Sequence, residues 1–157
     1  MESDTPTAEA PGVAGPALGT MNHVGLTVRD LAASTERFYA PLLRFLGYRP
    51  IVEEPAMSVW LSASGCAVNL WQAKPEHAER SVERYAPGFH HFAFNADSWE
   101  SVDRCHAMLR EEGIKVLDPP ADYDYEPGYY ALFFEDPDGL KFELVHLPPQ
   151  SDASLVV

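Results

Sequence analysis

Four polar side chains occur in four apolar segments of the sequence, and together they could bind a metal ion. They are His23, Asn69, His91 and Glu143. Side chains along a strand alternate between its two faces, so each of these residues is expected on the face opposite its apolar neighbours. Two imidazoles and a carboxylate that meet in a cleft suit a divalent metal with open coordination positions. A lone strand histidine or glutamate is usually an ordinary core or surface residue, so this interpretation depends on all four sharing one concave side.

The segment Phe89–Asp97, with the sequence FHHFAFNAD, contains two adjacent histidines whose roles the alternation separates. Phe92 and Phe94 are expected to face the core, and His90 shares their side of the strand. His91 then lies on the opposite side. The sequence therefore predicts that His91 binds a metal and that His90 is structural.

The sequence repeats one order of elements, and this repeat indicates the architecture more strongly than any single motif. A β-α-β-β-β order is predicted over residues 21–72 and again over 89–147, with a polar linker at 73–88. Residues 1–20 and 148–157 are expected to be tails. The first tail is expected to be disordered, because it is rich in proline, glycine and acids without a period. We therefore expect one domain built from two similar modules.

Each predicted helix has a recognisable start and end. Asp30 and Asp97 are expected to cap the first and second helix, and each helix should end at a glycine. Pro41 should kink the first helix or split it in two. Trp99 is expected to be buried on the second helix, together with other apolar residues at helical spacing.

The composition limits the classes of partner. Among 157 residues, acidic residues outnumber basic ones 24 to 11, which gives a net charge of -13. This charge argues against nucleic acid and anionic membranes and would tolerate a cationic ligand, although it could serve solubility alone. Cys66 and Cys105 do not form a disulfide framework and are expected to be small core residues. With no signal peptide or membrane-spanning segment in view, a cytoplasmic location is expected.

Three segments resemble the vicinal oxygen chelate superfamily: NHVGLTVRDLAASTERFY, FHHFAFNA and FFEDPDGLKFELVH. The superfamily includes glyoxalase I, extradiol dioxygenases, methylmalonyl-CoA epimerase, fosfomycin resistance thiol transferases and bleomycin-binding proteins. The resemblance covers residues 21–147 and implies an α+β fold. In that fold, two tandem βαβββ modules form a curved mixed-sheet cup with the helices on the convex side. The resemblance also implies that His23, His91 and Glu143 bind one divalent ion, which would be Fe, Mn, Ni, Co or Zn.

The remaining residues expected to line the cup would contact the substrate. Asn69 departs from the glyoxalase I pattern, in which a carboxylate transfers a proton, because an amide takes up no proton at neutral pH. Asn69 is instead expected to orient a water or the substrate, and Trp71 shares its side of the strand. Tyr129 is expected to face the cup. Tyr123 and Tyr125 belong to a loop that could either cover the substrate or pack on the sheet edge.

Two classes of function follow from these observations. The first is a metalloenzyme for a small carbonyl or aromatic substrate, of the lyase, isomerase or dioxygenase type, in which the metal is a Lewis acid or an oxygen activator. The second is a small-molecule-binding protein without catalysis, like the bleomycin-binding members. A homodimer is expected, because symmetric dimers are the commonest assembly. In this superfamily the two modules of one cup can come from one chain or from two.

Overall fold

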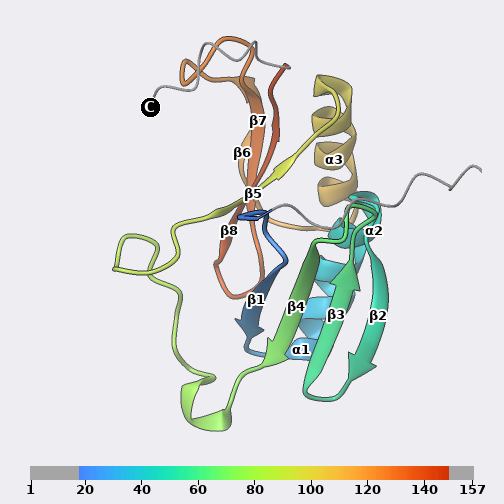
Figure 1. Cartoon of the computed structure of the whole chain (residues 1–157). Coiled ribbons are helices and arrows are strands. Elements are labelled where there is room, and N and C mark those ends of the chain that lie inside the picture. Colours follow the sequence, from blue (N-terminus) through green and yellow to red (C-terminus); the bar gives the residue numbers. More distant parts are fainter. Residues whose placement is uncertain (1–17, 149–157) are drawn as a thin grey trace, which may run out of the picture.

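The computed structural model describes residues 18–148 and contains the predicted β-α-β-β-β order twice (Figure 1). The tails predicted at 1–20 and 148–157 therefore lie outside the described residues, apart from 18–20 and 148. The first module comprises β1 (His23–Val28), α1 (Leu31–Ser34), η1 (Thr35–Tyr39), α2 (Ala40–Phe45), β2 (Arg49–Glu54), β3 (Met57–Leu61) and β4 (Ala67–Gln72). The short helix η2 (Pro75–His77) lies in the connecting segment. The second module comprises β5 (Phe92–Asn95), α3 (Trp99–Glu111), β6 (Val116–Asp122), β7 (Tyr130–Glu135) and β8 (Lys141–His146).

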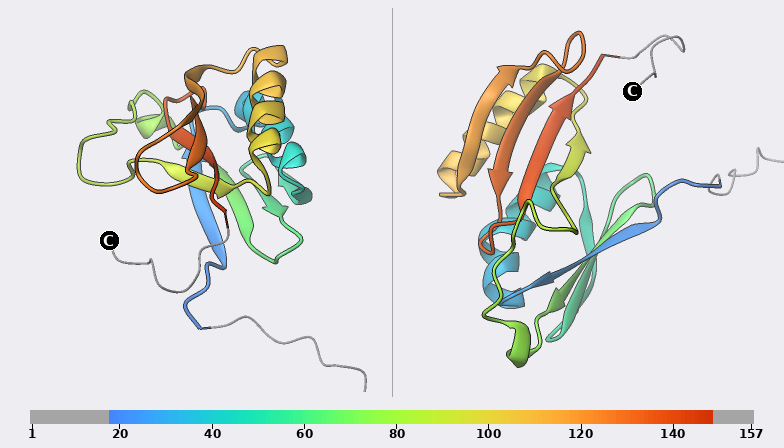
Figure 2. Two further views of the ribbon diagram at one scale, coloured as in Figure 1. Left: turned by 90° about the horizontal axis from the view of Figure 1, so that it is seen from above. Right: turned by 90° about the vertical axis from the view of Figure 1, so that its left-hand side faces the viewer.

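Each module forms its own four-stranded mixed sheet, and the right-hand view of Figure 2 shows the two separate sheets one above the other. The strand orders are β1-β4-β3-β2 and β5-β8-β7-β6. In both sheets the first strand pairs in parallel with the last, and the other pairs are antiparallel. The α+β class and the tandem modules are therefore confirmed. The registers also match, because Gly25 lies opposite Asn69 and Ala93 lies opposite Glu143.

One hydrophobic core joins the two modules. The apolar faces of both sheets and apolar residues of the helices contribute to it. Phe142 of β8 lies 5.2 Å from Phe38 of the first module, measured between ring centroids, so aromatic packing crosses the boundary between modules. The fully buried members include Trp60, Leu70, Phe38, Leu42, Val102, Cys105, Leu109, Phe134, Phe142 and Leu144. The opposite face of each sheet turns away from this shared core. On the second sheet that face carries a smaller buried apolar cluster of Ala131, Phe133 and Val145.

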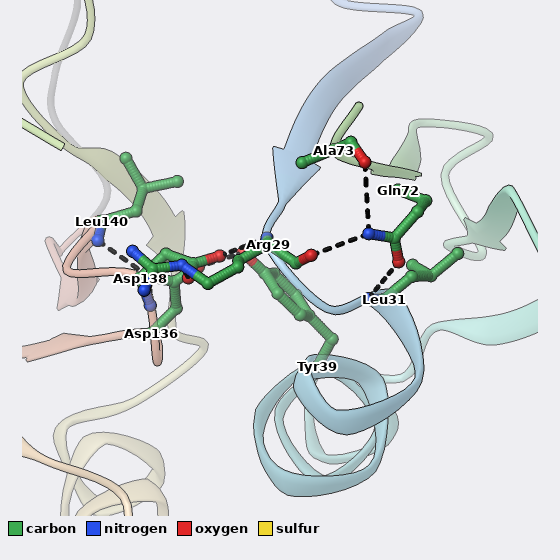
Figure 3. Close-up of polar contacts among 8 residues, drawn as sticks. All are labelled: Arg29, Leu31, Tyr39, Gln72, Ala73, Asp136, Asp138 and Leu140. Atoms are coloured by element: carbon green, nitrogen blue, oxygen red, sulfur yellow. Dashed lines mark hydrogen bonds and ion pairs between the residues drawn. The ribbon is translucent and has the colours of Figure 1, made fainter. Parts of the chain in front are cut away.

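The DPDG turn between β7 and β8 also joins the modules, through polar contacts (Figure 3). The Tyr39 hydroxyl donates a hydrogen bond of 2.7 Å to the buried carboxylate of Asp136. Asp136 also accepts hydrogen bonds from the backbone N–H groups of Asp138 and Leu140. The carboxylate of Asp138 accepts a hydrogen bond from the backbone N–H of Arg29 at 2.7 Å and lies 3.5 Å from its guanidinium Nε. We call these contacts the inter-module clasp.

The first helical segment begins and divides where the sequence indicates. Asp30 caps α1 as predicted, by accepting a hydrogen bond from the backbone N–H of Ala33 at 3.0 Å. A π-helical stretch, η1, precedes Pro41 at the start of α2, because proline cannot continue a regular helical hydrogen-bond ladder. Gly47 and Gly113 follow α2 and α3 with φ values of +80° and +69°, as expected for residues that end helices.

The start of α3 differs from the prediction in two respects. Ser98 caps this helix in place of Asp97, because the Ser98 hydroxyl accepts a hydrogen bond from the backbone N–H of Ser101. Asp97 instead accepts a hydrogen bond from the Ser101 hydroxyl. Trp99 was predicted to be buried but is 53% exposed, because it lies at the margin of the buried stripe of the helix. None of the described helices is long and apolar enough to cross a membrane.

Candidate metal centre

The open face of the second sheet brings together two of the residues predicted to bind metal. Glu143 lies in β8 opposite Ala93, whose methyl side chain takes up little room beside the carboxylate. The Glu143 side chain is only 2% exposed. His91 immediately precedes β5, and its Nε2 lies 3.2 Å from Oε2 of Glu143. An imidazole and a carboxylate therefore face each other, as the alternation along these segments predicted.

Tyr129 occupies the other oxygen of this carboxylate. Its hydroxyl donates a hydrogen bond to Oε1 of Glu143. Burial, the hydrogen bond to Glu143 and the negative charge of Glu143 together raise the pKa of the Tyr129 hydroxyl, with burial as the largest cause. The phenol therefore keeps its proton and remains a hydrogen-bond donor. Both oxygens of Glu143 thus have a partner, which a buried carboxylate requires.

His90 orients His91 from outside the core, which corrects its predicted position. The prediction extended the strand alternation to His90, but β5 begins only at Phe92 and His90 is exposed. Its Nδ1 lies 2.7 Å from Nδ1 of His91, and its ring centroid lies 5.4 Å from that of Tyr85. This contact directs Nδ1 of His91 toward His90 and leaves Nε2 for Glu143. Only the adjacency of the two histidines could have indicated it.

The loop that leads into β7 forms an aromatic cluster beside Glu143. The rings of Tyr123 and Tyr125 are stacked, with centroids 5.4 Å apart and planes 8° apart. Both rings meet Tyr129 edge to face. Tyr123 also packs edge to face on Phe133 at 5.3 Å, which matches the predicted alternative of packing on the sheet. Tyr125 is 72% exposed, so one aromatic ring of this cluster is available to a ligand.

The open face of the first sheet carries the other predicted residues, which are His23, Asn69 and Trp71. His23 is exposed at the start of β1, and its Nδ1 lies 2.7 Å from Oδ1 of Asn22. Asn69 has its Oδ1 buried without a hydrogen-bond partner among the described residues. Trp71 is 45% exposed, and its Nε1 lies 3.8 Å from the position that a Cβ on Gly25 would take. The indole therefore lies over Gly25, where the strand has no side chain.

The predicted metal ligands form two groups in a single chain. Within residues 18–148, no three or more His, Cys, Asp or Glu side chains lie close enough together to hold a metal ion. His23 and Asn69 lie on the first sheet, whereas His91 and Glu143 lie at the second. One described chain thus provides a pair of donors, and His23 stands apart from them.

Comparison with known proteins places this arrangement in a family. Residues 20–144 match the family model of the Glyoxalase/Bleomycin resistance protein/Dioxygenase superfamily. The chain belongs to this superfamily. The uncharacterised protein YqjT of Bacillus subtilis (strain 168) is 37% identical over 129 residues, which cover 80% of this chain and 97% of that protein.

Solved structures of the superfamily share the fold. A presumed glyoxalase from Bacillus halodurans superposes with a TM-score of 0.73 at 28% identity, covering 83% of this chain and 97% of that chain. The lactoylglutathione lyase of Agrobacterium tumefaciens has a TM-score of 0.59 at 21% identity, covering 84% of this chain and 96% of that chain. At this identity, the second likeness concerns the fold alone. The expected membership of the superfamily and the glyoxalase-like fold are therefore confirmed.

Proposed function

We propose that this chain is a divalent-metal-dependent enzyme that acts on a small, oxygen-chelating carbonyl or aromatic substrate. The observation that carries the proposal is the buried carboxylate of Glu143, 2% exposed, with Nε2 of His91 at 3.2 Å. Burying a carboxylate is costly, so its place on an otherwise apolar sheet face favours a functional role. Iron, manganese, nickel, cobalt and zinc all accept imidazole and carboxylate ligands. When bound, such an ion would supply Lewis acidity or activate oxygen.

The third ligand, His23, would come from a second copy of the chain. Each chain presents His23 on one open face and the His91–Glu143 pair on another, so a symmetric dimer can close two equivalent sites. In such a dimer the first-sheet face of one chain would cover the second-sheet face of the other. The exposed indole of Trp71 and the unpaired Oδ1 of Asn69 favour a covered state for the first-sheet face.

The chain's own residues would bind and orient the substrate in this closed site. Oδ1 of Asn69 would accept a hydrogen bond from a substrate hydroxyl, amine or bound water, because it has no other described partner. Trp71 and Tyr125 would contact the apolar body of the substrate with their exposed rings. The rings of Tyr123 and Tyr129 would exclude water from the carboxylate of Glu143, a role in which the Tyr123 hydroxyl takes no part. The acidic surface argues against nucleic acid and anionic membranes as partners.

Metal content tests the first part of the proposal. Wild type and His91→Ala, purified without added metal or chelator, are analysed by elemental mass spectrometry. About one transition metal ion per chain is expected in wild type and much less in the variant, because a ligand has been removed. Iron would direct the next assay to oxygen consumption with catechols, and the other metals to dicarbonyl or thiol-transfer substrates. Absence of metal in both proteins, with none taken up on titration, would refute the proposal.

A mixing experiment tests whether the site is shared between chains. His23→Ala and His91→Ala are each expected to bind metal poorly. After the two variants are mixed and their subunits exchanged, a heterodimer contains one site with both histidines intact. If sites form between chains, metal binding should recover to about half the wild-type stoichiometry in the heterodimer, which is about a quarter in a randomly exchanged equimolar mixture. Lack of recovery in a mixture proven to contain heterodimers would place all ligands in one chain.

A binding protein without catalysis is the second candidate. The net charge of -13 and the exposed Trp71 and Tyr125 rings favour a cationic aromatic ligand for such a protein. The two candidates differ in their response to His91→Ala. A binder should retain its ligand after this substitution, whereas the metalloenzyme should lose metal and activity together.

A further inference from the structure

The contacts of Glu143 distinguish its two oxygens, although a free carboxylate has two equivalent ones. Oε1 accepts a hydrogen bond from the Tyr129 hydroxyl, and Oε2 faces Nε2 of His91. The side chain is 2% exposed, so water does not compete for these positions. Of the two oxygens, only Oε2 points toward the other candidate metal ligand.

Tyr129 is itself held firmly in place. Its backbone N–H donates to the carbonyl oxygen of Glu126 at 3.0 Å, and its carbonyl oxygen accepts from the N–H of Tyr123 at 2.9 Å. Its ring meets Tyr123 at 6.4 Å and Tyr125 at 5.3 Å, in both cases edge to face. These contacts restrict the phenol through its backbone and through two neighbouring rings. The hydroxyl is therefore prepositioned and does not need to be recruited when a ligand arrives.

We propose that Tyr129 is a positioning residue for the metal centre, which holds Oε1 of Glu143 so that Oε2 alone binds the metal. This inference rests on the proposed function. Hydrogen-bond partners of metal ligands fix the orientation of those ligands, and removing one such partner typically weakens metal binding by about 10–100-fold. With Oε1 bonded to the phenol, Oε2 of Glu143 would be the oxygen that holds the metal.

A purely structural role for Tyr129 makes a different prediction. The hydroxyl could serve only to satisfy a buried acceptor, since an unpaired one lowers the stability of the folded state. Loss of the hydroxyl would then lower the unfolding temperature of the metal-free protein but leave the bound metal unchanged. The geometry of the bound metal is therefore the measurement that separates the two roles.

The test uses Co²⁺ as the probe, with wild type, Tyr129→Phe and the control Tyr123→Phe. Tyr123 belongs to the same aromatic cluster, but the hydroxyl that donates a hydrogen bond to Glu143 is that of Tyr129. Affinity is measured by titration calorimetry and coordination by the visible absorption of bound Co²⁺. We expect Tyr129→Phe to bind Co²⁺ about 10–100-fold more weakly with altered absorption bands, and Tyr123→Phe to resemble wild type. A further variant, Tyr129→Gln, retains a side-chain hydrogen-bond donor without adding an imidazole ligand, and it should recover part of the affinity.

Wild-type affinity and an unchanged Co²⁺ spectrum in Tyr129→Phe would overturn the inference while leaving the proposed function intact. An equal loss in Tyr123→Phe would also overturn it, because the cluster rather than the hydroxyl would then be responsible. Failure of the wild type to bind Co²⁺ would overturn both proposals. Unfolding curves of the metal-free proteins verify that the variants are folded, and Tyr129→Gln replaces Tyr129→Phe if the latter is not.

Discussion

The two sheets have the same topology and register, yet the polar side chains on their open faces differ in how many partners they have within the described chain. At the matched position of the last strand, the second sheet carries Glu143 and the first carries Asn69. Glu143 is buried and bonded through both oxygens, under a cluster of tyrosines. Oδ1 of Asn69 has no hydrogen-bond partner within residues 18–148, and Trp71 on the same face is 45% exposed.

This difference indicates a division of roles between two copies of one module. The second sheet provides the carboxylate of Glu143, which Tyr129 and His91 of the same chain hold in position. The first sheet provides Oδ1 of Asn69, which has no partner among the described residues, and the exposed ring of Trp71. Such groups are expected on a surface that binds substrate or another chain. A repeated architecture therefore does not require repeated chemistry.

The largest difference in metal affinity is expected between alanine substitutions at the two matched positions. Glu143→Ala should weaken metal binding by more than about 100-fold, because it removes a ligand and the second oxygen with it. Asn69→Ala should leave metal affinity close to that of wild type, because Asn69 is proposed to bind substrate. Titration with Co²⁺ measures both affinities. Similar losses in the two variants would show that the two faces contribute equally to the metal centre.

A smaller effect should follow from opening the inter-module clasp. Tyr39→Phe removes the hydrogen bond to the buried carboxylate of Asp136 and should lower the free energy of unfolding by about 1.5–3 kcal/mol. Since both sheets share one core, denaturant unfolding should remain a single transition. Two separate transitions in wild type would mean that the two sheets belong to independently unfolding units.

The unpaired amide predicts a change in the opposite direction. Asn69→Leu should leave the stability of the free chain unchanged or raise it by up to about 1 kcal/mol, because it removes a buried acceptor that has no partner. Ligand binding or dimerisation should weaken in the same variant. Thermal unfolding at several protein concentrations separates the two effects. A clear destabilisation at low concentration would contradict the unpaired state of Oδ1.

The smallest effect concerns pH. Burial raises the pKa of Asp136 in the folded protein, although hydrogen bonds from Tyr39 and the backbone oppose this. The folded state then binds more protons than the unfolded state between the two pKa values, so this group should increase stability as the pH falls through that interval. Compared with Asp136→Asn, wild type should gain stability on mild acidification. Urea unfolding of both proteins from neutral pH downward measures this difference, and parallel curves would contradict it.

The sequence predicted the elements and their faces well, because alternation and capping are local. It assigned His91 and Glu143 to one face, and the structure places them in contact. The choice of Asp97 as a helix cap failed because Asp97 and Ser98 are adjacent and either residue type can cap. The position of His90 was wrong because alternation does not reveal where a strand begins.

The separation of His23 from the His91–Glu143 pair could not be predicted from the sequence, for a different reason. It depends on how the two modules pack, and this follows from long-range contacts such as that between Phe38 and Phe142. No local period encodes such a contact. The hydrogen bond between Tyr129 and Glu143 likewise depends on the path of the loop before β7, which residue types alone do not determine.

The parallel pairing of first and last strands also sets an order for folding during synthesis. β1 can pair only after Gln72 has been made, and β5 only after His146 has been made. Closing such long loops is slower than forming a local hairpin. Phe142 lies in β8, so the final strand completes both the second sheet and the core between modules. A nascent chain that stalls before β8 would therefore expose the apolar surface of both modules, which makes the last residues of the domain the ones on which protection from aggregation depends.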